Sequence, residues 1–156
     1  MPHRMLQQFS EKDFNLFQKL VKSKVGISVR PGKKNILGVK LAHRLRQLGL
    51  TSYFAYYRYL LKPEGIKELQ HLTNTITIDT TEFFRGKRQF KLLREHILPG
   101  LIRQKNKKKR IRIWSSGCST GQEPYSIAML VNEMVGIDMS WDIKILATDI
   151  NTHSLK

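Results

Sequence analysis

The chain has 156 residues with 28 Lys or Arg and 12 Asp or Glu, which gives a formal net charge of +16 at pH 7. Hydrophobic residues make up 40% of it, so the composition excludes a disordered chain and favours one good domain, or one small domain with part of another. The one cysteine, Cys118, excludes an internal disulfide and fits a reducing, cytoplasmic compartment, and no apolar run is long enough to cross a bilayer.

Residues 1–75 are predicted to form a compact bundle of four short helices. Ser10 is a suitable cap for the first helix, because Asp13 follows three residues later as in a capping box. The apolar side chains of this helix recur at helical spacing, at Phe14, Phe17, Leu20 and Val21. Gly26 lies at its end, and the short links to the later helices are typical of a bundle.

The second helix is predicted from about Lys34 to Leu48, with Gly49 as its left-handed stop. The residues expected on its buried face are Ile36, Leu37, Leu41, Leu45 and Leu48. The spacing of Lys33, Lys40 and Arg44 predicts that they share the outer face. A third helix from Thr51 is expected to bury Phe54, Tyr57, Leu60 and Leu61, and a fourth is expected to bury Ile66, Leu69 and Leu72.

Positive charge gathers in two stretches. One is the second helix, with Lys33, Lys34, Lys40, Arg44 and Arg46, and the other is the connector 103–110. This charge permits binding to nucleic acid, to an anionic membrane or to an acidic protein, and it does not choose among them. A charge run before a strand is usually solvated, so we expect the connector to be a solubilising loop.

The second half of the chain predicts the start of an α/β sheet. Segment 76–86 is expected to be a loop or linker, followed by an amphipathic helix over 90–104 that is interrupted near Pro99. From residue 110 onward the pattern is strand, helix over 123–135 and strand over 142–147, which is the opening β-α-β of a parallel sheet.

These patterns divide the chain into three parts: a helical domain (1–75), a linker with a connecting helix (76–109) and the start of an α/β domain (110–156). Two strands and one helix cannot bury both faces of a parallel sheet. We therefore expect the α/β part to be incomplete, or to pack against the helical part or a second copy of the chain.

The most informative stretch is 111–126, in which an alternating strand leads into a loop of small residues and then into the start of a helix. Small residues let the backbone approach a ligand, and the free N–H groups of the helix start point at the same place. A second apolar strand follows, with Asp149 at its end. A glycine-bearing loop followed by an acid after the next strand is the general layout of nucleotide recognition, with the acid on the ribose hydroxyls.

Three motifs carry a resemblance to a known family. They are Thr80-Thr-Glu-Phe-Phe-Arg85, Trp114-Ser-Ser-Gly-Cys-Ser-Thr-Gly-Gln-Glu-Pro-Tyr-Ser126 and Ala147-Thr-Asp-Ile150. In their order and spacing, and with a helical region upstream, the chain resembles the CheR-type chemotaxis receptor methyltransferases over essentially its whole length. The resemblance implies a helical N-terminal domain joined to a Rossmann-like catalytic domain. It also implies an enzyme that methylates glutamate side chains on cytoplasmic receptor helices with S-adenosylmethionine (SAM).

The resemblance further implies which residues form the site. Arg85 is expected at the catalytic centre, and the residues expected to bind the cosubstrate are Asp79, Thr81, Arg85, Gly121, Glu123 and Asp149. Asp79 stands where the family has an Asn, and a carboxylate cannot donate a hydrogen bond as an amide does. Receptor helices are rich in glutamate, so the residues expected to steer the chain toward them are Lys40, Arg44 and Arg46.

Chemistry suggests a role for each charged residue. Methyl transfer from a sulfonium to an ionised carboxylate needs position and charge arrangement more than acid–base help. Glu123 suits the ammonium group of the cosubstrate, Asp149 suits its ribose and Arg85 suits the substrate carboxylate. Each also has a plainer explanation, as a helix-start acid, a helix cap and a surface arginine respectively. Phe83 and Phe84 are expected to anchor domain packing, and Tyr125 is expected to lie in the core.

Two other functions stay open. One is a non-catalytic module that docks on acidic receptor helices, and the other is a basic nucleic-acid-binding domain. The second is disfavoured because no aromatic residues alternate with the basic run at 103–110. If the chain is a truncated form of the enzyme, we expect weak or no turnover from it alone. No metal site is predicted, since the five His residues show no ligand spacing, and Cys118 lacks the nearby base that a catalytic thiol needs.

Overall fold

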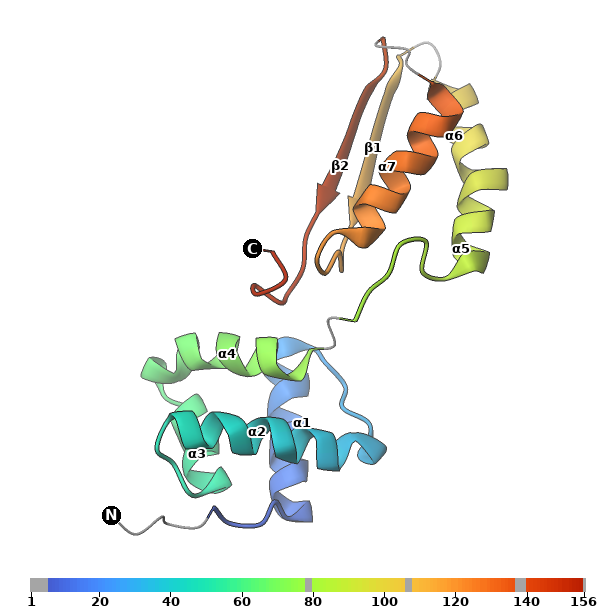
Figure 1. Ribbon diagram of the computed structural model, residues 1–156. Coiled ribbons are helices and arrows are strands. Elements are labelled where there is room, and N and C mark those ends of the chain that lie inside the picture. Colours follow the sequence, from blue (N-terminus) through green and yellow to red (C-terminus); the bar gives the residue numbers. More distant parts are fainter. Residues whose placement is uncertain (1–5, 78–79, 106–107, 137–139, 156) are drawn as a thin grey trace. The chain divides into compact units, whose positions relative to one another are not determined.

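The computed structural model of the chain describes residues 6–77, 80–105, 108–136 and 140–155. The chain divides into two compact units, Met1–Thr77 and Ile78–Lys156 (Figure 1). The first unit is helical, and the second combines helices with a short parallel sheet. The predicted fold class, a helical domain followed by an incomplete Rossmann-like domain, is thereby confirmed.

The first unit contains four helices joined by short turns. They are α1 (Glu11–Val25), α2 (Lys34–Gln47), α3 (Tyr53–Leu60) and α4 (Ile66–Ile76), with 3-10 turns at Pro31–Lys33 and Pro63–Gly65. The predicted cap of α1 is confirmed, because Ser10 accepts a hydrogen bond from the Asp13 amide while the Asp13 carboxylate accepts one from the Ser10 amide. Gly26 ends α1 in the left-handed conformation, with a φ of 79°. The termini of α1 therefore follow from local sequence alone.

The core of the first unit differs from the predicted apolar faces of α2 and α3. On α2 the buried arc runs through Leu37, Gly38, Leu41, Ala42 and Leu45, whereas Ile36 is 50% exposed. Gly38 explains the rotation, because a Cβ there would lie 2.8 Å from the ring of Phe9 and the glycine lets the two elements pack closely. The prediction that Ile36 is buried is therefore wrong.

The face of α3 is rotated by one residue relative to the prediction. Tyr53, Tyr56 and Leu60 are the buried residues of α3, whereas Phe54 and Leu61 are about half exposed. A hydrogen bond contributes to this orientation of α3 beside apolar packing, because the buried Tyr56 hydroxyl donates to Glu68 on α4 at 2.7 Å. On α4 itself, Leu72 is buried, whereas Ile66 is 71% exposed, contrary to the prediction.

Arg44 does not lie on an outer face of α2, as its spacing with Lys33 and Lys40 predicted. Its guanidinium donates to both carboxylate oxygens of Glu68, at 2.8 and 2.7 Å, and Glu68 is only 5% exposed. Burial by itself would raise the pKa of Glu68, but the hydrogen bonds from Arg44 and Tyr56 outweigh it, so this pKa is lowered. The same pair raises the pKa of Arg44, chiefly through the hydrogen bond to Glu68. Arg44 therefore ties α2 to α4.

The second unit is built on two parallel strands, β1 (Arg110–Ser115) and β2 (Asp142–Ala147), joined by helix α7 (Gln122–Val135). The register pairs Ile111 with Ile143 and Ile113 with Ile145. Figure 1 shows α7 and the preceding helix lying alongside the strands. Ile113, Ile143 and Ile145 pack against a core of Leu98, Ile127, Leu130 and Val131 from helices α6 (Leu98–Lys105) and α7, and Ile111 is also buried.

The other face of the sheet is uncovered among the described residues. Trp114 pairs with Leu146 in the register, and these side chains are 67% and 60% exposed. The alternation of strand side chains places Arg112 and Lys144 on this same face. The expectation that two strands and one helix leave a sheet face unburied agrees with this exposure.

The segment before β1 is one continuous helical stretch, as predicted for residues 90–104, and it begins earlier, at Lys87. α5 (Lys87–Leu92) passes through a π-turn (Leu93–Ile97) into α6. Pro99 lacks an N–H group, and in a regular α-helix its ring would crowd the carbonyl of the residue four positions earlier. The wider π-helical turn at Leu93–Ile97 includes that carbonyl and relieves the crowding. The predicted interruption near Pro99 therefore takes the form of a π-turn. No described helix is both long enough and apolar enough to cross a membrane.

Candidate functional site

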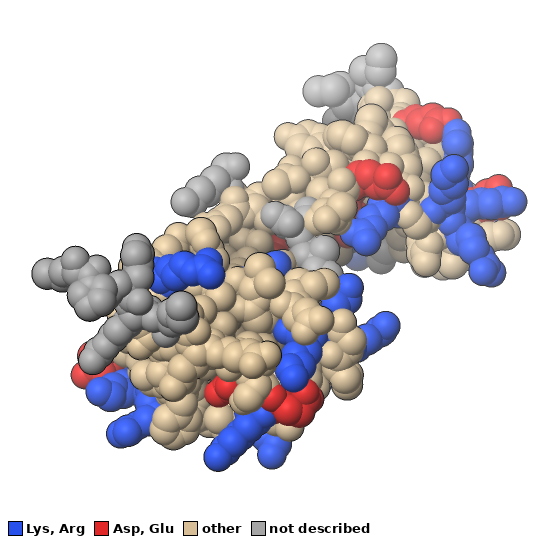
Figure 2. Space-filling model, turned by 60° about the horizontal axis from the view of Figure 1, so that its bottom comes forward, with Lys and Arg blue, Asp and Glu red and all other residues tan. Residues whose placement is uncertain are grey.

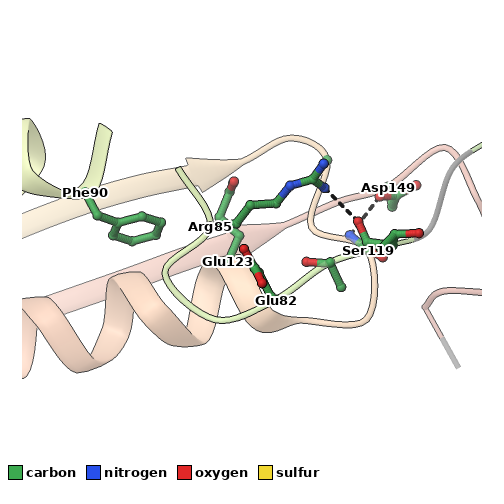
Figure 3. A pocket seen from close by; sticks show the side chains of 9 residues that line it. Glu82, Arg85, Phe90, Ser119, Glu123 and Asp149 are labelled. Carbon is green, nitrogen blue, oxygen red and sulfur yellow. Dashed lines mark hydrogen bonds between the residues drawn. The ribbon is translucent and has the colours of Figure 1, made fainter. Parts of the chain in front are cut away.

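The second unit contains a small pocket that gathers residues from three segments of the chain. Its volume is about 110 Å³, and it is lined by Thr80, Thr81, Glu82, Arg85, Phe90, Gly117, Ser119, Glu123 and Asp149 (Figure 3). The three segments are the loop 80–86 with the start of α5, the β1–α7 loop with the first turn of α7, and the turn after β2. The carboxyl ends of both strands therefore meet at the pocket, as in other open α/β sheets.

Asp149 fixes the shape of the β1–α7 loop. One of its carboxylate oxygens accepts a 2.8 Å hydrogen bond from the Ser119 amide, and the other accepts a 2.7 Å bond from the Asn151 amide. Ser119 adopts a left-handed conformation (φ 47°), which is uncommon for a residue with a side chain. The Cys118 amide also donates to the Thr148 carbonyl at 3.0 Å. The two loops are thus held together at the pocket by the Asp149 carboxylate and by one bond between backbone groups.

Glu123 lies in the first turn of α7, where a carboxylate is favoured by the helix dipole. The hydroxyl of Ser115, a residue that is 2% exposed at the end of β1, donates a 2.6 Å hydrogen bond to Glu123. Gly121 caps α7 with a φ of 102°, which a side chain would strain. Gly121 does not line the pocket; it permits the sharp turn into α7, and Gly117 is the glycine that lines the cavity.

Arg85 reaches the pocket from the loop 80–86. Its guanidinium donates a 2.6 Å hydrogen bond to the Thr80 carbonyl and, in Figure 3, extends toward the end of the pocket where Ser119 and Asp149 lie. Thr81, partly buried, lines the same cavity. The loop is attached to α7 by a 2.9 Å hydrogen bond from the Phe84 amide to the Ser126 hydroxyl.

The pocket carries a charge of opposite sign to the chain as a whole. Three carboxylates, on Glu82, Glu123 and Asp149, line it beside one guanidinium, on Arg85, although the chain has only 12 acidic residues against 28 basic ones. Such a cavity suits a ligand with cationic groups and one anionic group. S-adenosylmethionine has this pattern, since it carries a sulfonium, an ammonium and a carboxylate, so the residues present fit the cosubstrate that the motifs imply.

The structure brings together four of the predicted site residues, Thr81, Arg85, Glu123 and Asp149, around one cavity. Asp79 lies outside the described residues. Lys40 and Arg46 belong to the first unit, where the Lys40 ammonium donates to the Thr77 carbonyl and Arg46 is exposed on α2. The sequence indicated the loop 116–120 as a whole, and the structure shows that Gly117 and Ser119 are its residues that line the pocket. The sequence gave no role to Glu82 or Phe90, which also line it.

The prediction that Tyr125 lies in the core is wrong, whereas a packing role for Phe84 is found within the second unit and one for Phe83 stays a prediction. Tyr125 is 67% exposed and does not lie in the core; its ring lies where a Cβ added at Gly121 would come within 3.4 Å of it. Phe83 is 55% exposed, while Phe84 packs edge-on against Phe90 within the second unit, with ring centroids 5.4 Å apart. Cys118 is buried, and burial raises the pKa of its thiol, which disfavours a nucleophilic thiolate. The described residues contain no cluster of side chains able to hold a metal ion.

Two family models match the chain. Residues 79–156 match the SAM-binding domain of CheR methyltransferases, and residues 12–77 match the all-alpha domain of the same methyltransferases. A probable chemotaxis protein methyltransferase of Rhizobium etli is 36% identical over 136 residues, which are 87% of this chain and 51% of that protein.

Further relatives are similar over the same region. A chemotaxis protein methyltransferase of Borreliella burgdorferi is 36% identical, covering 88% of this chain and 50% of the relative. One of Escherichia coli is 33% identical, covering 94% of this chain and 49% of the relative. The chain thus spans about half the length of the curated relatives it matches.

Proposed function

Because the chain belongs to the CheR family of SAM-dependent chemotaxis methyltransferases, we propose that its pocket holds S-adenosylmethionine for methyl transfer to glutamate carboxylates of chemoreceptors. The observation that carries this proposal is the convergence of Arg85, Glu123 and Asp149, from three separate segments, on one negatively charged cavity. When bound, the cosubstrate supplies an activated methyl group on a sulfonium. The chain's own residues bind and orient the two reactants.

Each carboxylate retains hydrogen-bonding capacity for this role. Glu123 accepts one bond from Ser115 and keeps further lone pairs for a ligand ammonium group. Each Asp149 oxygen accepts a bond from a backbone amide, and a carboxylate oxygen has a second lone pair that suits a ribose hydroxyl. Arg85 has donors beyond the one that binds Thr80, and a guanidinium binds a carboxylate in a two-point geometry.

The size of the cavity limits what this chain does alone. Its volume of about 110 Å³ is smaller than the roughly 300–1,000 Å³ of ordinary small-molecule sites. We therefore expect it to enclose one part of the cosubstrate, with low affinity and with weak or no turnover. Robust methyl transfer by the isolated 156-residue chain would contradict this expectation.

Binding of S-adenosylhomocysteine, measured by calorimetry or NMR titration, tests the proposal. Glu123→Gln keeps the shape of the side chain and removes its charge, and we expect it to weaken binding by about tenfold, as for loss of a charged hydrogen bond. Glu133→Gln is the matched control, because Glu133 is an exposed residue of the same helix that pairs with Arg94. Absence of binding by the unmodified chain, or equal affinity in Glu123→Gln, would refute the proposed site.

The outer face of α2 is a second candidate surface, for docking on acidic receptor helices. Ile36 and Val39 are 50% and 71% exposed along this face, and Lys40 and Arg46 flank them. An apolar stripe bordered by basic residues complements a helix whose own apolar stripe is bordered by glutamates. Within each unit, Figure 2 shows the Lys and Arg side chains of the visible face in separate groups, with acidic side chains between some of them, and this arrangement does not favour binding along a nucleic-acid backbone.

Charge reversal at Arg46 tests this surface. We expect Arg46→Glu to weaken binding to a glutamate-rich receptor fragment several-fold and to lower its salt dependence. Lys24→Glu makes the same charge change at the exposed C-terminal end of α1 and serves as the control. Equal losses in both variants would indicate a general charge effect instead of docking on α2.

A further inference from the structure

We propose that Ser126 is a positioning residue whose buried hydroxyl fastens the loop 80–86 to α7 and so keeps Arg85 and Thr81 at the pocket. This inference rests on the proposed function of that pocket. Ser126 does not line the cavity. It is the last residue of the motif that begins at Trp114, and its residue type alone does not indicate a role.

The hydroxyl of Ser126 makes two hydrogen bonds in opposite directions. It donates to the Gln122 carbonyl, one turn earlier in α7, at 2.6 Å, and it accepts from the Phe84 amide at 2.9 Å. Ser126 is 0% exposed, so water cannot replace either partner in place. The bond within α7 fixes the direction of the hydroxyl, and its lone pair then faces the loop.

The loop needs such a fastening because its backbone is strained. Phe84 has a φ of 54°, a left-handed conformation that costs a bulky residue energy and persists only where surrounding contacts enforce it. Gly86, two residues later, is also left-handed, with a φ of 76°. Arg85 lies between these two residues, so its direction depends on both of them being held.

Two contacts hold Phe84 in this conformation. One is the hydrogen bond from its amide to Ser126, and the other is the edge-on packing of its ring on Phe90. Glu123 lies three residues before Ser126 on α7, so the two residues share one side of the helix. Helix α7 therefore carries Glu123 for the ligand and Ser126 for the loop 80–86, which also lines the pocket.

The experiment compares Ser126→Ala with the unmodified chain by amide hydrogen exchange and by titration with S-adenosylhomocysteine. We expect the Phe84 amide to exchange at least tenfold faster in Ser126→Ala, while the Ser119 amide, bound to Asp149, keeps its protection. We also expect the affinity for S-adenosylhomocysteine to fall about tenfold. Ser126→Thr retains a hydroxyl and should retain the protection of Phe84.

Ser23→Ala is the matched control, because the Ser23 hydroxyl also donates to a backbone carbonyl of its own helix but has no long-range acceptor role among the described contacts. If Ser126 only stabilised the fold, Ser126→Ala would exchange faster at both the Phe84 amide and the Ser119 amide, and the variant would unfold at a lower denaturant concentration. That result, or unchanged exchange at Phe84, would overturn the inference. Failure of the unmodified chain to bind S-adenosylhomocysteine would instead overturn the proposed function, and the exchange comparison would still decide whether Ser126 holds the loop.

Discussion

The Ser119 amide and the Asp149 carboxylate, 30 residues apart in the sequence, are joined by a 2.8 Å hydrogen bond at the carboxyl ends of the two strands. Through this bond the acid after β2 determines the conformation of the loop after β1. The plainer explanation of Asp149, as a capping group for the following turn, also holds in part, because its other oxygen accepts from the Asn151 amide. One carboxylate thus shapes both loops and faces the pocket.

Replacement of Asp149 by Asn tests this dual role. An amide has a single acceptor oxygen, so one of the two backbone amides would face an NH₂ group. We expect Asp149→Asn to weaken S-adenosylhomocysteine binding by more than tenfold in a calorimetric titration. Asp142→Asn, at the opposite end of β2, is the control and should bind as the unmodified chain does. Native affinity in Asp149→Asn would contradict this role.

Glu68 is expected to be the most sensitive polar position of the first unit. Glu68→Ala removes the partner of Arg44 and Tyr56, and breaking a buried ion pair from one side costs about 3 kcal/mol. Four of the five tyrosines lie in the first unit, and both tryptophans lie in the second. The near-UV circular dichroism of tyrosine therefore reports mainly the unfolding of the first unit, and tryptophan fluorescence reports the unfolding of the second. We expect only the tyrosine signal to shift in urea. Glu64→Ala, an exposed position nearby, should shift neither.

The same carboxylate makes the stability of the first unit depend on pH. The pKa of Glu68 is lower in the folded chain than its ordinary value of 4.5, so its stabilisation is complete above about pH 4.5 and is lost as the pH falls through the folded pKa. We expect the difference in unfolding free energy between the unmodified chain and Glu68→Gln to shrink as the pH falls below 4.5. A difference that stays constant from pH 7 to pH 3 would contradict this linkage.

Gly121 is expected to tolerate no side chain without a loss of stability. Its φ of 102° lies in a region that residues with a Cβ rarely adopt, and such strain costs about 1–3 kcal/mol. We expect Gly121→Ala to lower the urea midpoint of the tryptophan transition. Gly100→Ala, within helix α6 and with open space around a new Cβ, should be neutral or slightly stabilising.

The sequence was sufficient to predict the elements whose signals are local. The cap at Ser10, the stop at Gly26 and the bounds of β2 depend on residues a few positions apart, and all three agree with the structure. The meeting of Glu123 with Asp149 also follows from the pattern, since parallel strands bring their carboxyl ends to one edge, whereas the place of Thr81 and Arg85 was implied by the family resemblance alone. The binding roles of these residues stay predictions.

Features that depend on tertiary partners could not be predicted in the same way. Helical spacing assigned Arg44 to an outer face because it carries no information about Glu68 on another helix. The rotation of α2 toward Gly38 depends on Phe9, which comes from a segment outside that helix. Ser126 and Ser115 are small polar residues whose importance arises from burial beside a distant amide and a distant carboxylate. A single sequence gives no signal for such pairings.

The uncovered face of the two-stranded sheet bears on how the chain behaves in concentrated solution. Trp114 and Leu146 present apolar surface there, beside strand edges that can pair with another chain. Arg112 on this face is paired with Asp142, and Lys144 adds a further positive charge there, so repulsion between neighbouring molecules of net charge +16 opposes their association. Because salt screens charge repulsion, we expect the chain to remain dispersed at low ionic strength and to associate through this exposed face as ionic strength rises.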